Sequence, residues 1–432
     1  MLNPPISNAS EIANSEELAI YLYEAQRVEN AILTQYLFAA MSIKREYTDR
    51  EWLVSEIEMA RKCRETLYAI ARDEMVHLTV TCNALIGLGL GSRLSTSDYR
   101  QTSERWFSNR FSLTPFSKAT LNRMIDFEAP PLQPDGNYEW MNLRPVKPTY
   151  DRVGRLYEKL QTAYVKYADG RIFAQASPKM PDTKDKIGQN ALAQPKAIAD
   201  ITAALEKVRA EGEGSSTLSA KSHYEKLCEL KVSLVKSRIH IGSLVYPAIS
   251  NPHVSQTSAW HRTEGHAALA RKKTNTLLTG LPARTASLFN HVYQTVMLML
   301  DQYYSPMSET DDQRRKLLDL SRSAMSALIL PIGELLMEIP IEPCVEARCA
   351  NAAPPFELAP DIVLPVIQGA RWPFLLSRTK LAEDEARELV GQFGTPPNGP
   401  YSMFGARLTT IAENLHALHC RITEISKLPE GV

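Results

Sequence analysis

Hydrophobic residues recur every three to four positions along most of this 432-residue chain, which is the period of an amphipathic α-helix. Few segments show the strict two-residue alternation of a half-buried strand. The pattern predicts helices over 16–43, 50–88, 150–168, 195–210, 220–238, 283–304, 310–337 and 405–426, with a short charged helix after 381. The sequence therefore predicts an all-α protein.

This pattern is interrupted in three long stretches that are rich in proline or in polar residues, 89–149, 169–194 and 338–380. A connection as long as 89–149 is more often a functional cover or crossover than a simple turn. Pro331 falls inside a predicted helix and should kink or break it, because proline lacks an N–H donor and clashes with the turn before it.

The predicted helices divide the chain into three parts. These are a helical bundle over 16–238, an extension over 239–380 and C-terminal helices over 381–432. Helices 283–304 and 310–337 are apolar over too wide an arc for a free-standing pair, so they need a large partner surface. We therefore expect the second half to pack on the bundle.

Composition narrows the choice of partners. Basic and acidic residues number 49 each, and a formal net charge of zero argues against nucleic acid or an anionic membrane as the main partner. The first residues are polar, and no apolar run approaches the length of about eighteen residues that spans a bilayer. We therefore predict no membrane span and a cytoplasmic location. Among the six cysteines only Cys344 and Cys349 are close together, and a single pair is a poor zinc signature.

Helix phase separates inward-facing carboxylates from surface charges. At about 100° per residue, Glu29 lies in the middle of the apolar stripe of the first predicted helix, whereas Glu24 points away from it. In the second predicted helix, Glu74 and His77 share the apolar stripe and Glu65 falls on the opposite side. A carboxylate at the centre of an apolar face is costly to bury unless it is paired or binds a metal.

The pair formed by Glu74 and His77 has a recognisable spacing. A Glu-x-x-His unit places a carboxylate and an imidazole one turn apart, and carboxylate-bridged di-iron bundles use such a unit on two of their helices. His223 begins a third apolar stripe, although a buried histidine taken alone is more often a hydrogen-bonded core residue. Inward polar positions on three helices together favour a metal site. Motifs for dinucleotides, nucleoside triphosphates and serine hydrolysis are absent from the sequence.

A series of short motifs, taken in order, resembles a known family, the ferritin-like domain of the iminophenyl-pyruvate dimer synthase type. Members of this family act in violacein- and rebeccamycin-like pathways. The resemblance covers about residues 16–380. The motifs are Val28-Glu29-Asn30, TQYLFAAMSI at 34–43, AIARDEMVHLTVTCNALIGLG at 69–89, VGRLYEKL at 153–160, EGEG at 211–214, SHYEKLCEL at 222–230, YPAISNPHV at 246–254, FNHVYQTVMLML at 289–300 and PPFELAPDIVLP at 354–365.

The resemblance implies a ferritin-like bundle with long crossover loops that holds one or two iron ions. The implied iron ligands are Glu29, Glu74, His77, Glu158, Glu213 and His223. Helix phase places Glu158 well away from the apolar stripe of its own helix, and Glu213 rests on the EGEG motif alone.

The predicted function is that of an iron-dependent oxidoreductase. It would activate O2 or peroxide to oxidise or couple an amino-acid-derived metabolite in natural-product biosynthesis, with Tyr36 or Tyr157 as a nearby proton or electron donor. The stretches 89–149 and 169–194 would cover the substrate pocket. The alternative is a non-catalytic binding or partner protein whose metal site has decayed. Iron storage is disfavoured because more than half of the chain lies beyond one four-helix unit, and a homodimer remains open.

Overall fold

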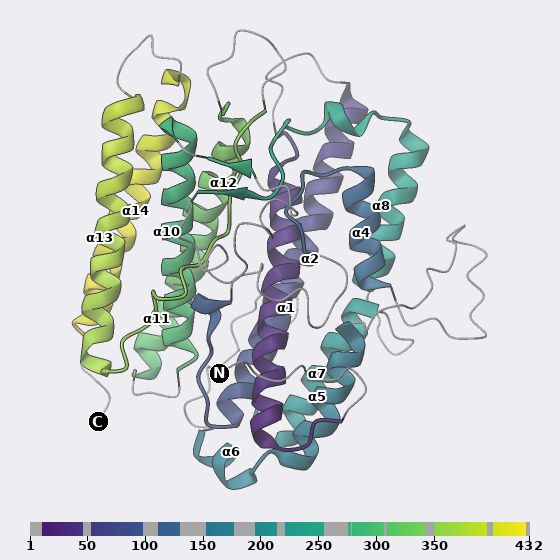
Figure 1. The fold of residues 1–432 in the computed structure, drawn as a ribbon, viewed down its shortest axis with the longest axis vertical. Coiled ribbons are helices and arrows are strands. Elements are labelled where there is room, and N and C mark those ends of the chain that lie inside the picture. The colour runs from purple at the N-terminus through teal and green to yellow at the C-terminus, as the bar shows by residue number, and fades with distance from the viewer. Residues whose placement is uncertain are drawn as a thin grey trace.

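The computed structural model describes residues 11–45, 53–97, 111–129, 153–176, 195–213, 221–254, 275–277, 279–305, 309–341, 350–394 and 401–428. Helices dominate these residues, and the strands among them are a parallel pair of two residues each, β1 (Pro252–His253) and β2 (Asn275–Thr276). The prediction of an all-α helical bundle is confirmed (Figure 1).

The first half of the chain forms a bundle built on two long antiparallel helices, α1 and α2 (Figure 1). Its helices are α1 (Ser15–Met41), α2 (Val54–Gly87), the 3-10 turn η1 (Leu94–Thr96), α4 (Lys118–Glu128), α5 (Val153–Tyr167), α6 (Gly170–Ala176), α7 (Ile198–Glu213) and α8 (His223–Ser237). At the start of α1, the side chain of Asn14 accepts a hydrogen bond of 2.8 Å from the backbone N–H of Glu17. Such a cap satisfies one of the free amides at a helix start.

The other side of the bundle consists of helices that are interrupted halfway along their length. Helix α4 packs on α8, and α5 packs on α7. Figure 1 shows the first pair standing above the second, so α4 with α5, and α7 with α8, each take the place of one long helix. Both interruptions lie at the same level of the bundle. Several helix ends therefore meet in its interior.

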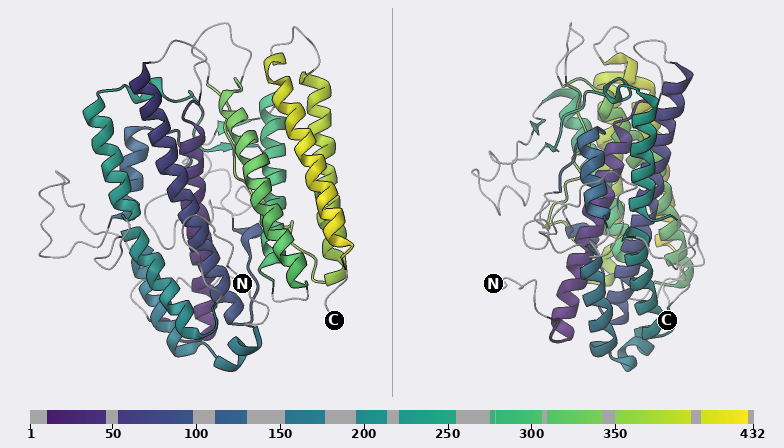
Figure 2. Two further views of the ribbon diagram at one scale, coloured as in Figure 1. Left: turned by 180° about the vertical axis from the view of Figure 1, so that it is seen from behind. Right: turned by 90° about the vertical axis from the view of Figure 1, so that its right-hand side faces the viewer.

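The second half forms a layer of helices beside the bundle. It comprises η4 (Ile241–Ser243), α10 (Gly280–Tyr303), α11 (Asp311–Ala324), the π-helical turn η5 (Met325–Ile329), α12 (Leu330–Glu338), η6 (Gln368–Ala370), α13 (Arg371–Leu389), the π-helical turn η7 (Val390–Gly394), η8 (Ser402–Phe404) and α14 (Gly405–Ser426). Helices α12 and α1 contact each other, and the left view of Figure 2 shows the green and yellow helices standing beside the bundle. Tyr293 of α10 donates a hydrogen bond of 2.9 Å to Asn30 of α1.

Pro331 leaves the predicted mark on its helix. The π-helical turn η5 directly precedes α12, whose first turn contains Pro331. In a regular helix, the missing N–H of Pro331 would have bonded the carbonyl of Ala327. That carbonyl instead accepts a hydrogen bond of 3.1 Å from the side chain of Asn414 in α14. The widened turn is therefore stabilised by a neighbouring helix.

The continuous helix formed by α11, η5 and α12 is the one described segment that is long and apolar enough to cross a bilayer. It runs from Asp311 to Glu338, and 61% of its most apolar window is buried inside the protein. This burial is typical of a core helix. The four cysteines in the described part of the chain are free thiols, whereas Cys344 and Cys349 lie outside it.

The structure corrects three stretches that were predicted to be irregular. Helix α4 lies within 89–149, α6 lies within 169–194, and α13 begins at Arg371, inside 338–380. The apolar positions of α4 are Leu121, Met124 and Ile125, a spacing typical of one helix turn, but prolines on either side hide so short a pattern. Most of the remainder of 89–149 and 169–194 lies outside the described residues, so their expected role as covers stays a prediction.

Candidate metal centre

A cluster of buried carboxylates and imidazoles lies where the interrupted helices end. Glu29 comes from α1, Glu74 and His77 come from α2, Glu128 is the last residue of α4, and His223 is the first residue of α8. Their exposed fractions run from 1% for Glu29 and His223 to 7% for Glu128. Burying so many ionisable groups together is costly unless they pair with one another or bind a cation.

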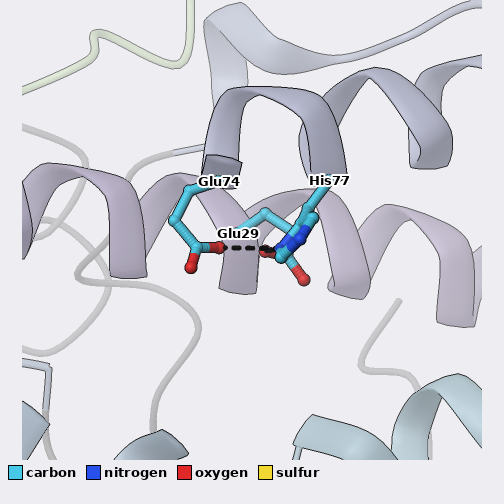
Figure 3. A group of neighbouring side chains, drawn as sticks. All are labelled: Glu29, Glu74 and His77. Atoms are coloured by element: carbon cyan, nitrogen blue, oxygen red, sulfur yellow. Dashed lines mark hydrogen bonds and ion pairs between the residues drawn. The ribbon is translucent and has the colours of Figure 1, made fainter. Parts of the chain in front are cut away.

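These side chains form two overlapping groups that share Glu74. Glu29, Glu74 and His77 form the first group, and Glu74, Glu128 and His223 form the second. Within each group the possible ligand atoms lie within 4.8 Å of one another. We call these the Glu29 group and the Glu128 group. Figure 3 shows Glu29 reaching across to Glu74 and His77.

In the Glu29 group, the imidazole of His77 lies between two inner carboxylates, Glu29 and Glu74, and an outer carboxylate, Glu211. Its Nδ1 is 3.1 Å from Glu74 Oε2 and 3.5 Å from Glu29 Oε2. Its Nε2 is 3.2 Å from Oε2 of Glu211, near the end of α7. Lys207 Nζ, one turn earlier on α7, lies 3.6 Å from the other oxygen of Glu211.

The Glu128 group repeats this arrangement around His223. The Nδ1 atom of His223 is 3.0 Å from Glu74 Oε1 and 3.7 Å from Glu128 Oε2. Its Nε2 is 3.4 Å from Oδ2 of Asp73, which accepts a hydrogen bond of 2.9 Å from Lys226. In both groups, Nδ1 of the imidazole therefore faces the shared Glu74. Nε2 faces an outer carboxylate, Glu211 or Asp73, which forms an ion pair with a lysine.

Each group also contains one buried tyrosine. Tyr157 of α5 donates a short hydrogen bond to Glu29 Oε1. Tyr36 of α1 donates a hydrogen bond of 2.7 Å to Glu128 Oε1. Both tyrosines have an exposed fraction of only 1%. The terminal carboxylate of each group is thus held by a phenol from a different helix.

Local capping fixes the position of His223. Ser222 accepts a hydrogen bond from the backbone N–H of Glu225, and the Glu225 carboxylate accepts one from the N–H of Ser222. This reciprocal pair is a capping box, which defines where α8 begins. His223 is therefore held at the first position of the helix, where its ring stacks near that of His77 with 5.4 Å between centroids.

The electrostatics of the cluster reflect burial and mutual charge. Burial, with the nearby Glu74, raises the pKa of Glu29 to about 8. Burial opposes the charged form of both imidazoles, but the surrounding carboxylates outweigh it and raise the pKa of His77 and His223 well above the usual range. Burial also opposes ionisation of Asp73, yet His223 and Lys226 hold its pKa at about 2. Without a metal, protons supply the positive charge that balances these carboxylates.

The polar atoms of the cluster fit a bound metal. Glu29 Oε2 and both ring nitrogens of His223 are buried, and no hydrogen bond to them is found within the described residues. They lie close to other polar atoms without the alignment of a hydrogen bond. Buried polar atoms without partners are rare in proteins and call for an explanation such as an ion. Carboxylate oxygens and imidazole nitrogens suit iron and similar divalent metals.

The structure brings together four of the six predicted ligands, Glu29, Glu74, His77 and His223, and places both predicted tyrosines beside them. The structure does not place Glu158, the ligand that the resemblance implied, in the cluster. Glu158 is exposed on the outer face of α5, as its helix phase indicated. The backbone of α7 ends at Glu213, whose side chain lies outside what the structure describes.

Glu128, Glu211 and Asp73 were not predicted. Glu128 lies in a helix that composition concealed, and Glu211 belongs to the EGEG motif two residues before the glutamate that was chosen. Asp73 directly precedes Glu74 in the sequence, and its proximity to a second imidazole depends on the packing of α8. No signal in the sequence identified it.

A ferritin-like family model matches residues 22–232, the segment that contains every residue of this cluster. This part of the chain is a ferritin-like domain. The chain is 24% identical over 366 residues to 2-imino-3-(indol-3-yl)propanoate dimerase of Chromobacterium violaceum, covering 78% of this chain. It is 22% identical over 393 residues to dichlorochromopyrrolate synthase of Lentzea aerocolonigenes, covering 81% of this chain. The predicted resemblance is confirmed, at low identity.

The ferritin-like domain and its extension span only part of these relatives. The matches cover 34% and 37% of the two relatives, about a third of their length. Among solved structures, a ferritin like protein from Caulobacter vibrioides matches 69% of this chain and 89% of its own, at 13% identity and a TM-score of 0.39. That score is too low to carry an argument about the site.

Proposed function

We propose that the ferritin-like domain binds iron at the two groups that share Glu74 and uses it to oxidise or couple an amino-acid-derived metabolite. The observation that supports the proposal is the paired arrangement of the cluster. Each group offers two carboxylates and one imidazole, and the shared Glu74 suits a bridge between two ions. Iron held there would supply a redox centre for reaction with O2 or peroxide.

Residues around the ligands would tune such a centre. The outer carboxylates Glu211 and Asp73 face the remaining ring nitrogens of the two histidines. Such partners orient a metal-binding imidazole and make it a better ligand. Tyr157 and Tyr36 keep water away from Glu29 and Glu128, and burial raises the pKa of both phenols well above the ordinary value. Each phenol therefore keeps its proton and holds it beside a ligand carboxylate. The phenol can then act as a proton donor to the site.

The names of the relatives support the choice of substrate class. One acts on an imine of an indole-bearing propanoate, and the other is named as a synthase of dichlorochromopyrrolate. We propose a related amino-acid-derived substrate and a role in natural-product biosynthesis. Since the chain spans about a third of these relatives, the proposal concerns the oxidative chemistry of the ferritin-like domain.

Metal analysis of the full chain, purified without chelator, tests the proposal. We expect one to two equivalents of iron in the unaltered protein. Glu74→Ala should lose all of it, because Glu74 belongs to both groups, while Glu29→Ala and Glu128→Ala should each affect one group. Glu65→Ala is the control, since Glu65 lies in the same helix but its side chain is 66% exposed and forms an ion pair with Arg61 on the surface. Iron content that is unchanged in Glu74→Ala would contradict the proposal.

Oxygen consumption separates catalysis from binding. Ferrous iron added anaerobically, followed by oxygen, should give uptake that depends on Glu74 and responds to aromatic 2-oxo or 2-imino acids. A chain that retains iron but consumes no oxygen with any such substrate would favour the alternative of a non-catalytic partner protein.

A further inference from the structure

A cavity lies on the side of the α1–α2 pair that faces the second half of the chain. Its volume is about 410 Å³, and its walls come from α1, α2, α10 and the helix that contains η5. Thr34 lines it from α1 and Met75 lines it from α2. No side chain of the metal centre lines this cavity, although Leu33, which does, lies only about 40° from Glu29 around α1 at about 100° per residue.

The floor of this cavity is apolar and buried. Leu33, Val296, Met297 and Ile329 line it, and the exposed fraction of each is 5% or less. The methionines Met75, Met297 and Met325 share the lining with the tyrosines Tyr68 and Tyr293. Thioethers adapt their shape and make favourable contacts with aromatic rings. The volume also falls in the range of about 300–1,000 Å³ that is usual for small-molecule sites.

The more exposed part of the lining is positively charged. Arg45, Arg72 and Arg322 line the cavity, and the lining includes no carboxylate. Arg45 is paired with Glu334 at 2.5 Å, and Arg322 lies 3.9 Å from Asp319 at the edge of ion-pair range. Arg72 is exposed and has no ion pair within the described part of the chain. A guanidinium presents a planar fork that matches a carboxylate.

The π-helical turn shapes one wall of the cavity. Met325, Ser326 and Ile329 belong to η5 and all line the cavity. A π turn interrupts the regular spacing of side chains and is frequent at functional sites. Here the π turn precedes Pro331, and Asn414 donates a hydrogen bond to the Ala327 carbonyl within it. These two residues therefore stabilise the widened turn that forms the wall of the cavity.

We propose that this cavity binds an apolar monocarboxylate of the arylalkanoate class. The aromatic body would contact the methionine-rich floor, and the carboxylate would lie at the mouth, between Arg72 and Arg322. The inference does not depend on iron in the metal centre, because the cavity is lined by other residues. It gives the second half of the chain a direct part in ligand binding.

Calorimetric titration of the full chain with 3-phenylpropionate tests this site. Two further ligands separate its features: 3-phenylpropan-1-ol keeps the aromatic body without the charge, and propionate keeps the charge without the body. We expect measurable binding of 3-phenylpropionate alone. Arg72→Gln and Arg322→Gln should each weaken it roughly tenfold, as expected when a charge-assisted hydrogen bond is lost. Arg61→Gln, at an arginine of α2 with a side chain 71% exposed, is the matched control.

A blocking variant and a metal-site variant complete the test. Ser326→Trp should abolish binding, because Ser326 is exposed and lines the cavity, where a large ring can be added without disturbing the core. Glu128→Gln, in a helix that contributes no residue to the cavity lining, should bind as the unaltered chain does. Equal affinity for the alcohol, or unchanged binding in both arginine variants and Ser326→Trp, would overturn the inference. Loss of binding in Glu128→Gln would also overturn it, by placing the ligand in the metal centre.

Discussion

Asp301 of α10 connects the second half of the chain to the bundle. Its carboxylate accepts hydrogen bonds from the Ser92 hydroxyl at 2.6 Å and from the backbone amides of Leu94 at 2.7 Å and Ser95 at 2.9 Å. Leu94 and Ser95 begin the short turn η1, which follows α2, and their exposed fractions are 0% and 2%. The amides at the start of a helical turn have no hydrogen-bond partner within the turn, and the Asp301 carboxylate supplies one for each of them.

Asp301→Ala should lower the free energy of unfolding by about 3 kcal/mol. A buried amide left without a partner costs about 1–3 kcal/mol, and two amides are affected. Part of this cost is offset because a carboxylate no longer has to be buried. Asp301→Asn should cost roughly half as much, since its amide oxygen still accepts from one side of the turn.

Urea denaturation of metal-free protein, followed by circular dichroism, measures the effect of Asp301. Asp384→Ala is the control, because its side chain is 52% exposed and it pairs with Lys380 on the surface of α13. Exposed pairs of this kind contribute about 0–1 kcal/mol. A loss below about 1 kcal/mol for Asp301→Ala would refute the reasoning that these capped amides stabilise the contact between the two halves.

Three further predictions follow from other contacts. Tyr157→Phe should weaken iron binding at the Glu29 group, and Tyr36→Phe at the Glu128 group, by roughly 10–100-fold each; metal titration that finds both groups unaffected would contradict this role. Metal-free protein should lose stability as pH rises from 5 to 9, because Glu29, with its folded pKa raised from 4.5 to about 8, retains a proton that the unfolded chain releases. Glu29→Gln should flatten that decline in thermal melts across the same pH range. Asn414→Ala should cost about 1 kcal/mol by leaving the Ala327 carbonyl without its partner, and a melting temperature equal to that of the unaltered chain would argue against it.

The long helices of the bundle were predictable because their apolar stripes run without interruption. Glu29, Glu74 and His77 lie in the middle of such stripes, where phase alone identifies the inward face. The same rule indicated that Glu158 points outward, as it does in the structure, although the family resemblance implied the opposite.

Glu128 and Glu211 could not be predicted in this way. Glu128 is the final residue of α4, and Glu211 lies in the last turn of α7. A residue at a helix end has no full turn on both sides, so a periodic pattern carries little information about its direction. Glu213 was chosen over Glu211 on the EGEG motif alone, and two residues along a helix change direction by about 200°.

The interruption of α4–α5 and α7–α8 at one level has a consequence for cooperativity. Helix ends are the places where local opening costs least, and here they carry Glu128, Glu211 and His223 of the metal centre. A bound ion would join these ends to the uninterrupted α1–α2 pair and suppress their fraying. Amide hydrogen exchange in the last turn of α4 and the first turn of α8 should then report metal occupancy directly, while the middle of α1 exchanges at the same slow rate in either state. The region of the bundle with the lowest local stability would thus be the region whose stability depends most on the bound metal.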